Sequence, residues 1–324
     1  MDTLAVTKKR GDGNQKKNRV PSKTGWRKKF KKSIPFYLMG LPAMIYIVIN
    51  NYMPLYGLQI AFKDYRVIDG ITGSAWCGLK NFEFLFASDA WRITRNTVGY
   101  QFTWLILNTV ISVFLAIFLN EIIGRRAKKF YQSMIMLPYL ISFVIVAYIV
   151  YVFLSDTGLL NTFLGMLGLD PVSWYTEPKY WPIILTIVNS WKGVGFTTII
   201  YLSTIVGFGK EYYEAAELDG AGKWQQITKI TIPMLNPTII MMLTLGMGGI
   251  FRSDYSLFYQ VSRNSGVLYD VTDTIDTYVF RALISGNNMG MSSAAAFYQS
   301  VVCFVMVMIF NGIVRKISKE DAIF

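Results

Sequence analysis

The residues of this chain whose types and spacing could do chemistry are few, and the first to consider could hold a phosphate group. Residues 220–223 read Gly-Ala-Gly-Lys, whereas a nucleotide-binding P-loop needs the pattern Gly-x4-Gly-Lys-Ser/Thr. Glu217 stands where the first glycine belongs, and Trp224 stands where the hydroxyl residue belongs. The stretch therefore predicts a turn and not a nucleotide site.

Catalytic and metal-binding groups are scarce as well. The sequence contains no histidine, which removes imidazole from general acid–base catalysis and from metal coordination. We therefore expect no catalytic residue, no metal site and no enzyme activity. Composition indicates a membrane protein, because 53% of the residues are hydrophobic and 16% are charged, whereas soluble domains carry about 25% charged residues.

The positive charge is concentrated at the N-terminus. Residues 1–33 hold 12 of the 32 Lys and Arg residues, against Asp2 and Asp12 alone. A basic tail of this kind could bind nucleic acid. Here it adjoins a long apolar run that begins at Ile34, so we interpret it as the cytoplasmic flank of a membrane span, with the lipid bilayer and not nucleic acid as its partner.

Long uncharged runs predict an all-α membrane protein with six transmembrane helices, since about 20 apolar residues cross the hydrocarbon core. One membrane domain is expected over residues 34–316, between the tail 1–33 and a second tail, 317–324. The expected spans are residues 34–56, 96–120, 130–154, 181–206, 237–258 and 294–314. Gly246, Gly248 and Gly249 lie inside the fifth, where close helix packing is favoured over a locally unwound backbone.

Loop charges predict how these spans are oriented. The N-terminal tail carries 12 Lys and Arg residues and the loop at 121–129 carries 4, while the opposite loops 63–94, 156–180 and 259–293 carry 4, 1 and 2. Loops rich in Lys and Arg stay on the cytoplasmic side. Both termini, and the polar segment 210–233 between the fourth and fifth spans, are therefore expected in the cytoplasm.

Polar and aromatic residues within or near the spans are the candidates for ligand binding, because polar groups are costly there. Hydrogen-bonding and aromatic side chains in one cavity suit a sugar, and Lys192 or Arg252 would suit a carboxylate on it. The alternative is structural: Arg252 pairs with Asp254 or reaches the interface, and the tyrosines form an interfacial belt. The candidates are Asn189, Trp191, Lys192, Tyr201, Arg252, Asp254, Tyr255, Tyr259, Tyr298 and Gln299.

The segment 210–233 carries the most specific pattern. Residues 214–222 read Glu-Ala-Ala-Glu-Leu-Asp-Gly-Ala-Gly, which predicts a short helix with small side chains that ends in a glycine turn. Lys210 with Glu214 and Asp219 with Lys223 have the i,i+4 spacing of helical ion pairs. A helix of this kind can enter a groove on another protein, and a solvated loop helix is the alternative.

The same pattern resembles the cytoplasmic signature of permease subunits of bacterial binding-protein-dependent ABC importers. It comprises Glu214, Ala215, Ala216, Gly220, Ile230 and Pro233, with Ile232 where Leu is more usual. The resemblance implies the type I ABC importer permease fold. It also implies that this segment is the coupling helix in a cleft of the ATPase, with Glu214, Ala215, Ala216, Asp219, Gly220 and Gly222 as the coupling residues.

Other stretches resemble the carbohydrate branch of that family, the MalF/UgpA-like permeases, and within it the LplB/YteP-type oligosaccharide permeases of Gram-positive bacteria. They include residues 56–64, Tyr-Gly-Leu-Gln-Ile-Ala-Phe-Lys-Asp, and residues 276–281, Asp-Thr-Tyr-Val-Phe-Arg. The resemblance implies a multi-pass protein of a bacterial cell membrane that imports sugars. It implies a second homologous permease, an ATPase dimer and an extracellular sugar-binding lipoprotein as partners, with ATP and Mg held by the ATPase and no cofactor on this chain.

Two other functions remain to be weighed against the importer. An ion-coupled secondary transporter usually needs carboxylates inside its spans, and here only Asp254 lies near the end of one. A membrane enzyme or structural anchor is disfavoured by the absence of histidine and of any catalytic constellation.

Overall fold

The computed structural model describes residues 26–86, 89–286 and 288–317. Most of the predicted N-terminal tail 1–33 and of the C-terminal tail 317–324 lies outside the described residues. Within the described ranges the chain is helical, and the only strand-like feature is an isolated bridge between Lys63 and Trp76. The chain divides into two units, residues 1–56 and residues 57–324.

The described part of the first unit is helical. Helix α1 (Trp26–Ile47) begins inside the predicted tail and continues into a π-helical turn, η1 (Val48–Tyr52). Side chains from Ile34 to Tyr56 are exposed apart from Gly40. Because these side chains are almost all apolar, water is not a suitable environment for them, and the helix has the length and hydropathy of a membrane span.

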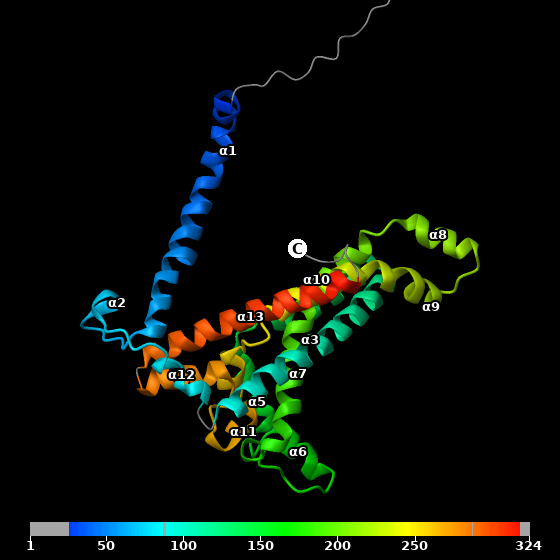
Figure 1. The fold of residues 1–324 in the computed structure, drawn as a ribbon. Coiled ribbons are helices and arrows are strands. Elements are labelled where there is room, and N and C mark those ends of the chain that lie inside the picture. Colours follow the sequence, from blue (N-terminus) through cyan, green and yellow to red (C-terminus); the bar gives the residue numbers. More distant parts are fainter. Residues whose placement is uncertain (1–25, 87–88, 287, 318–324) are drawn as a thin grey trace, which may run out of the picture. The chain divides into compact units, whose positions relative to one another are not determined.

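The second unit is built around two long helices that lie along each other, α3 (Ala90–Glu121) and α7 (Trp181–Val206) (Figure 1). Helix α10 (Ile232–Met247) packs against both of them, and α13 (Met289–Ile317) packs against α10 and α12 (Ile275–Gly286). The remaining elements are α2 (Gly70–Gly73), α4 (Arg125–Leu140), α5 (Phe143–Leu154), α6 (Leu159–Met166), α8 (Lys210–Leu218), α9 (Lys223–Gln226), α11 (Tyr269–Thr272), η2 (Met53–Phe62), η3 (Lys80–Phe86), η4 (Trp174–Thr176), η5 (Pro178–Tyr180), η6 (Ile227–Thr231), η7 (Leu257–Val261) and η8 (Gly266–Leu268).

Two apolar clusters hold the long helices together. One joins Trp104 of α3 to Leu185 of α7 and to Phe258 of the η7 turn. The other joins Ala116 of α3 to Tyr201 of α7 and Leu235 of α10. In Figure 1 the pair α8 and α9 lies at the end of this unit where α3 ends and α10 begins, away from α11 and α12.

Six helical stretches among the described residues are long and apolar enough to cross a membrane, as expected. Two of the predicted boundaries are wrong. The predicted span 130–154 is two helices, because α4 ends at Leu140 and α5 begins after Ser142, whose hydroxyl accepts from the amide of Ile145. Neither Ile141 nor Ser142 is charged, so a count of charges does not detect the break between α4 and α5.

The predicted span 237–258 is displaced toward the N-terminus, because the candidate span begins at Lys223 and ends at Met247. Helix α10 begins at Ile232 and ends at Met247, and residues 248–251 form turns. Gly246 does support close packing, since a Cβ there would overlap the Leu105 side chain of α3. For Gly248 and Gly249, however, the expectation of helix packing was wrong, because the helical backbone ends there. Arg252 and Asp254 consequently lie beyond the helix and not inside it.

Gly195 is the position where α7 approaches α4 most closely, and it gives a test of this packing. A Cβ at Gly195 would overlap the carbonyl oxygen of Ile135. We expect Gly195→Ala to destabilise the chain by about 1–3 kcal/mol, the usual range for overpacking, and to lower its melting temperature in detergent. Gly99→Ala on α3 is the control, because a Cβ there meets no atom within 4 Å. Equal melting temperatures for the two variants would contradict the packing.

Candidate functional site

The segment that links α7 to α10 consists of α8, a turn and α9. The turn is a Schellman motif, in which the Ala221 amide donates to the Ala216 carbonyl at 2.8 Å and the Gly220 amide donates to the Glu217 carbonyl at 3.0 Å. Gly220 adopts a φ of +77°. Glycine reaches this left-handed conformation without the steric cost that a Cβ brings.

Side-chain contacts also stabilise the turn. Lys223 pairs with Glu217 at 3.1 Å, and the Gln226 amide donates to the Ala221 carbonyl at 3.2 Å. Lys223 therefore pairs with Glu217 across the turn, and not with Asp219 as predicted. Hydrogen bonds from Lys223 and Gln226 lower the pKa of Glu217, so these contacts are present at neutral pH and are lost as the pH falls through the lowered pKa.

The outer surface of α8 is open. Glu214 and Ala215 are exposed, Ala216 is half-buried, and Leu218 is 90% exposed. On the inner side, the hydroxyls of Tyr213 and Thr231 form a hydrogen bond of 3.0 Å, which ties α8 to the start of α10. The segment thus presents a short helix with small and apolar side chains on one side, while its other side is fixed to the membrane helices.

A second feature is a cavity of about 360 Å³ between α3, α7 and α10. Asn189 and Tyr201, both predicted candidates, lie on its wall. The residues that line it are Gln101, Trp104, Leu105, Asn108, Thr109, Asn189, Gly193, Thr197, Tyr201, Met242, Leu245 and Gly246.

Amide side chains dominate the polar part of this cavity. The Asn108 amide donates to the Asn189 side-chain oxygen at 3.0 Å, and the Ser190 hydroxyl donates to the Asn108 oxygen at 2.6 Å. The Tyr201 hydroxyl is buried and has no hydrogen-bond partner among the described residues. A buried polar group without a partner is costly, and a hydroxylated ligand in this cavity can supply the missing hydrogen bond.

Lys192 belongs to the structure of the spans. Its ammonium group donates to the carbonyl oxygens of Pro138, Tyr139 and Ile141, with 2.9 Å to Tyr139. The Tyr139 and Ile141 carbonyls lie where α4 stops and helical partners run out, while the Pro138 carbonyl also accepts from the Ile141 amide at 3.2 Å. The ammonium also lies 4.8 Å from the ring centroid of Phe143. The position of Lys192 is explained by the break between α4 and α5.

Arg252 and Asp254 do not pair with each other, contrary to the structural alternative. One guanidinium nitrogen of Arg252 donates to the Ser300 hydroxyl at 3.0 Å, and no acidic side chain of the described residues pairs with it. The Arg252 carbonyl accepts from Gln101, which lines the cavity. Asp254 instead accepts from the Ser256 amide at 2.9 Å, so its carboxylate supports the turn that precedes η7.

The other predicted candidates lie outside this cavity. Trp191 lines a different cavity, between α4 and α7. Tyr255 stacks on Phe280 with 4.8 Å between ring centroids, and Tyr298 meets Phe251 edge to face. Gln299 donates to the Phe251 carbonyl at 2.7 Å and to the Asp276 carboxylate at 3.1 Å, so it holds the break after α10.

The prediction missed the face that α3 contributes to the cavity. Gln101, Trp104 and Asn108 follow one another at spacings of three and four residues, which places them on one side of a helix. The same periodicity joins Asn189, Gly193, Thr197 and Tyr201 on α7. The helical spacing of these uncharged polar residues is the signal that indicates this face. The prediction gave more weight to the charged residues.

Comparisons with known proteins give a consistent result. The family model described as "Binding-protein-dependent transport system inner membrane component" matches residues 108–319. A Bacillus subtilis protein, the polygalacturonan/rhamnogalacturonan transport system permease protein YteP, is 32% identical over 88% of each chain, and protein LplB of the same organism is 30% identical over 91% of this chain and 93% of its own. A solved bacterial ABC transporter that is involved in the import of the acidic polysaccharide alginate contains a chain that superposes with a TM-score of 0.80 and 33% identity, covering 90% of this chain and 99% of that one.

The Gly220 turn makes a prediction that is independent of any partner. Gly220→Ala forces a side chain into the left-handed region, at a cost of about 1–2 kcal/mol. Gly222→Ala is the matched control, because Gly222 has a φ of −70° and both positions have open space for a Cβ. We expect amide exchange over residues 214–222 to be about tenfold faster in Gly220→Ala than in Gly222→Ala, as measured by hydrogen–deuterium exchange. Indistinguishable exchange would show that φ does not determine this turn.

Proposed function

This chain belongs to the family of binding-protein-dependent transport system inner membrane components, and we propose that it is the sugar-transporting permease subunit of an ATP-driven importer that takes up acidic oligosaccharides. It is a multi-pass membrane protein. In this proposal it forms half of the translocation pathway in a bacterial cell membrane, of the Gram-positive type. The other half comes from a second homologous permease, and an extracellular lipoprotein delivers the sugar.

The proposed role of α8 and α9 is to contact the ATPase. The loop charges favour a cytoplasmic location for both termini and for this segment, and in this proposal the ATPase dimer on that side holds ATP and Mg. Glu214, Ala215, Ala216, Asp219, Gly220 and Gly222 form the contact region. In support, Glu214 and Ala215 are exposed, while the opposite side of α8 is fixed to α10 through Tyr213.

The proposed sugar pathway is the cavity between α3, α7 and α10. Its amides can hydrogen-bond to sugar hydroxyls, and Trp104 provides an aromatic wall. The observation that carries the choice of an acidic sugar is Arg252, whose backbone carbonyl accepts from Gln101 of the cavity wall. Its guanidinium is exposed, donates to the Ser300 hydroxyl and has no acidic partner among the described residues. Guanidinium groups bind carboxylates well, and the names of two similar proteins refer to polygalacturonan and to the acidic polysaccharide alginate.

In the proposed cycle this chain performs no covalent chemistry. ATP binding closes the ATPase dimer and displaces α8, and the attached spans then move from an inward-open to an outward-open arrangement. The binding protein releases its sugar into the cavity in the outward-open arrangement. Hydrolysis reverses the motion, and the sugar leaves on the cytoplasmic side.

Transport by the assembled complex in proteoliposomes tests the ATP-driven mechanism. We expect uptake that requires ATP and persists when ion gradients are collapsed. Glu214→Lys should abolish uptake and leave membrane insertion intact, because it reverses a charge on the contact surface. Glu211→Lys on the same helix is the control for the charge change, since Glu211 lies outside the motif, and it should retain most uptake. Uptake that follows an ion gradient without ATP would support the secondary transporter instead.

The choice of an acidic sugar rests on Arg252 and has its own test. Loss of a hydrogen bond to a charged group costs about 1.5–3 kcal/mol. We therefore expect Arg252→Gln to raise the KM for an oligogalacturonate roughly 10- to 100-fold, with Arg252→Lys less affected. The methyl-esterified oligomer of the same length is neutral, so its uptake should respond little. Equal losses for the charged and the neutral oligomer would remove Arg252 from substrate recognition.

A further inference from the structure

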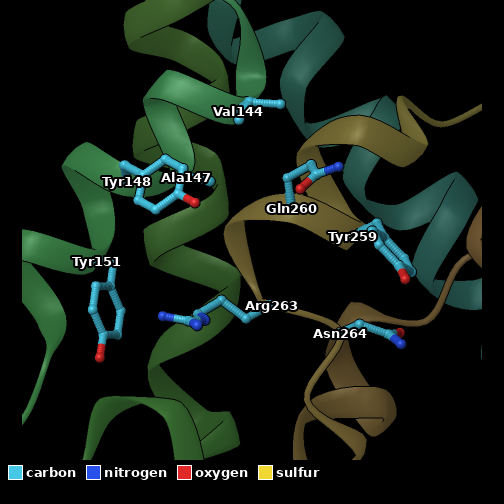
Figure 2. Close-up of a pocket in the computed structure, with 8 residues that line it drawn as sticks. All are labelled: Val144, Ala147, Tyr148, Tyr151, Tyr259, Gln260, Arg263 and Asn264. Carbon is cyan, nitrogen blue, oxygen red and sulfur yellow. The ribbon is translucent and has the colours of Figure 1, made fainter.

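A second polar cavity, of about 380 Å³, lies between α5 and the η7 turn (Figure 2). Arg263 extends from the end of η7 toward Tyr151 of α5 in this view, with Tyr148 nearby on the same helix. The Arg263 guanidinium lies 4.3 Å from the ring centroid of Tyr151. The cavity therefore combines a cation with aromatic walls.

Three hydrogen-bonding groups of this cavity have no hydrogen-bond partner among the described residues. Among the described residues, no hydrogen bond or ion pair engages the Arg263 guanidinium, the Gln260 amide or the Tyr148 hydroxyl. One acidic residue, Asp156, lines a neighbouring cavity together with Arg263 and does not pair with it. A cation and several donors thus face one space without an anion to neutralise them.

The backbone holds Arg263 in this place at a steric cost. Arg263 and Asn264 have φ values of 55° and 51°, and they are the only non-glycine residues with a positive φ among those described. The Asn264 amide donates to the Tyr259 carbonyl at 3.0 Å, and the Tyr269 hydroxyl bonds to the Asn264 side chain at 3.0 Å. Residues held in this region by their surroundings are concentrated at functional sites.

The Arg263 cavity is separated from the proposed sugar pathway. Leu257, Phe258 and Val261, on the other side of the η7 turn, are buried in the cluster that contains Trp104 of α3. This apolar layer lies between the two cavities. A sugar in the first cavity therefore does not reach Arg263.

The surroundings of the Arg263 cavity are those of a membrane surface. Helix α5 belongs to a candidate span, and Val144, Tyr148 and Val152 are exposed on it. Tyrosine and arginine are the residues that meet phospholipid headgroups at the ends of spans. Acyl chains can lie against the exposed apolar side chains of α5 while the headgroup reaches the guanidinium.

We propose that the cavity between α5 and η7 binds the anionic phosphodiester headgroup of a membrane phospholipid, with Arg263 as the cation that selects it. Tyr148 and Gln260 supply hydrogen bonds to the headgroup. The bound lipid then fills the space between α5 and η7 and fixes the two elements relative to each other. This site is distinct from the sugar pathway and does not depend on the identity of the sugar.

Native mass spectrometry of the purified complex, with both permeases and the ATPase present, tests this proposal. The measured quantity is the phosphatidylglycerol retained per complex after delipidation and back-addition of phosphatidylglycerol or phosphatidylcholine. We expect Arg263→Gln to lose phosphatidylglycerol retention about fivefold or more, and Arg263→Lys to keep most of it. Phosphatidylcholine, which has no net charge, should bind weakly to every variant.

Lys179→Gln is the matched control. Lys179 also lies over a tyrosine ring, at 4.8 Å from that of Tyr180, but it pairs with Glu177 and is exposed outside the cavity, so its loss should leave lipid retention unchanged. Equal retention by Arg263→Gln and the wild type would overturn the proposal. If inorganic phosphate stabilised the complex as much as phosphatidylglycerol does, the assignment to lipid would be overturned. A disulfide between Arg263→Cys and a cysteine in the second permease would show that a protein covers the cavity, which also overturns it.

Discussion

The backbone of a membrane span must find all its hydrogen-bond partners inside the protein, because the hydrocarbon core offers none. Two of the spans predicted from the sequence, 130–154 and 237–258, are interrupted, and side chains from other helices supply hydrogen bonds to the backbone at each interruption. Lys192 of α7 donates to carbonyls at the end of α4. After α10, the Asp276 carboxylate accepts from the Ser253 amide at 2.6 Å and from Gln299, which also donates to the Phe251 carbonyl. The helix arrangement depends on these contacts.

The same requirement separates structural from functional polar residues. A polar side chain that forms a hydrogen bond with the backbone at a helix break has a structural role. Such bonds account for Lys192, Asp254 and Gln299. Arg252 and Arg263 are different, because each carries a guanidinium without an acidic partner among the described residues. A charged side chain in a span is therefore by itself a weak indication of a binding site. A charged side chain that is not bonded to the backbone at a helix break is a better indication.

The sequence was sufficient for the class of fold, the number of spans and the turn at Gly220. Each of these rests on a local signal: a long apolar run, or a glycine where the backbone needs a positive φ. The breaks at Ile141 and Gly248 could not be predicted in the same way, because the side chains that bond to the backbone there are remote in the sequence. They are Lys192 for the first break, and Asp276 and Gln299 for the second. The wall formed by Asn108 was missed for a different reason: a span with uncharged polar residues still has the hydropathy of a span.

The two proposed functional regions are joined by α7 and α10. Residues 207–209 link α8 to α7, and the hydrogen bond of Tyr213 to Thr231 connects α8 to the beginning of α10 as well. A displacement of α8 therefore acts on both helices together, and both carry walls of the cavity, Asn189 on α7 and Gly246 on α10. Helix α10 ends just beyond the cavity, where the backbone turns at Gly248. Motion of α10 is thus transmitted to the level of the cavity, and beyond the end of α10 the side chains of Asp276 and Gln299 connect the turn to α12 and α13.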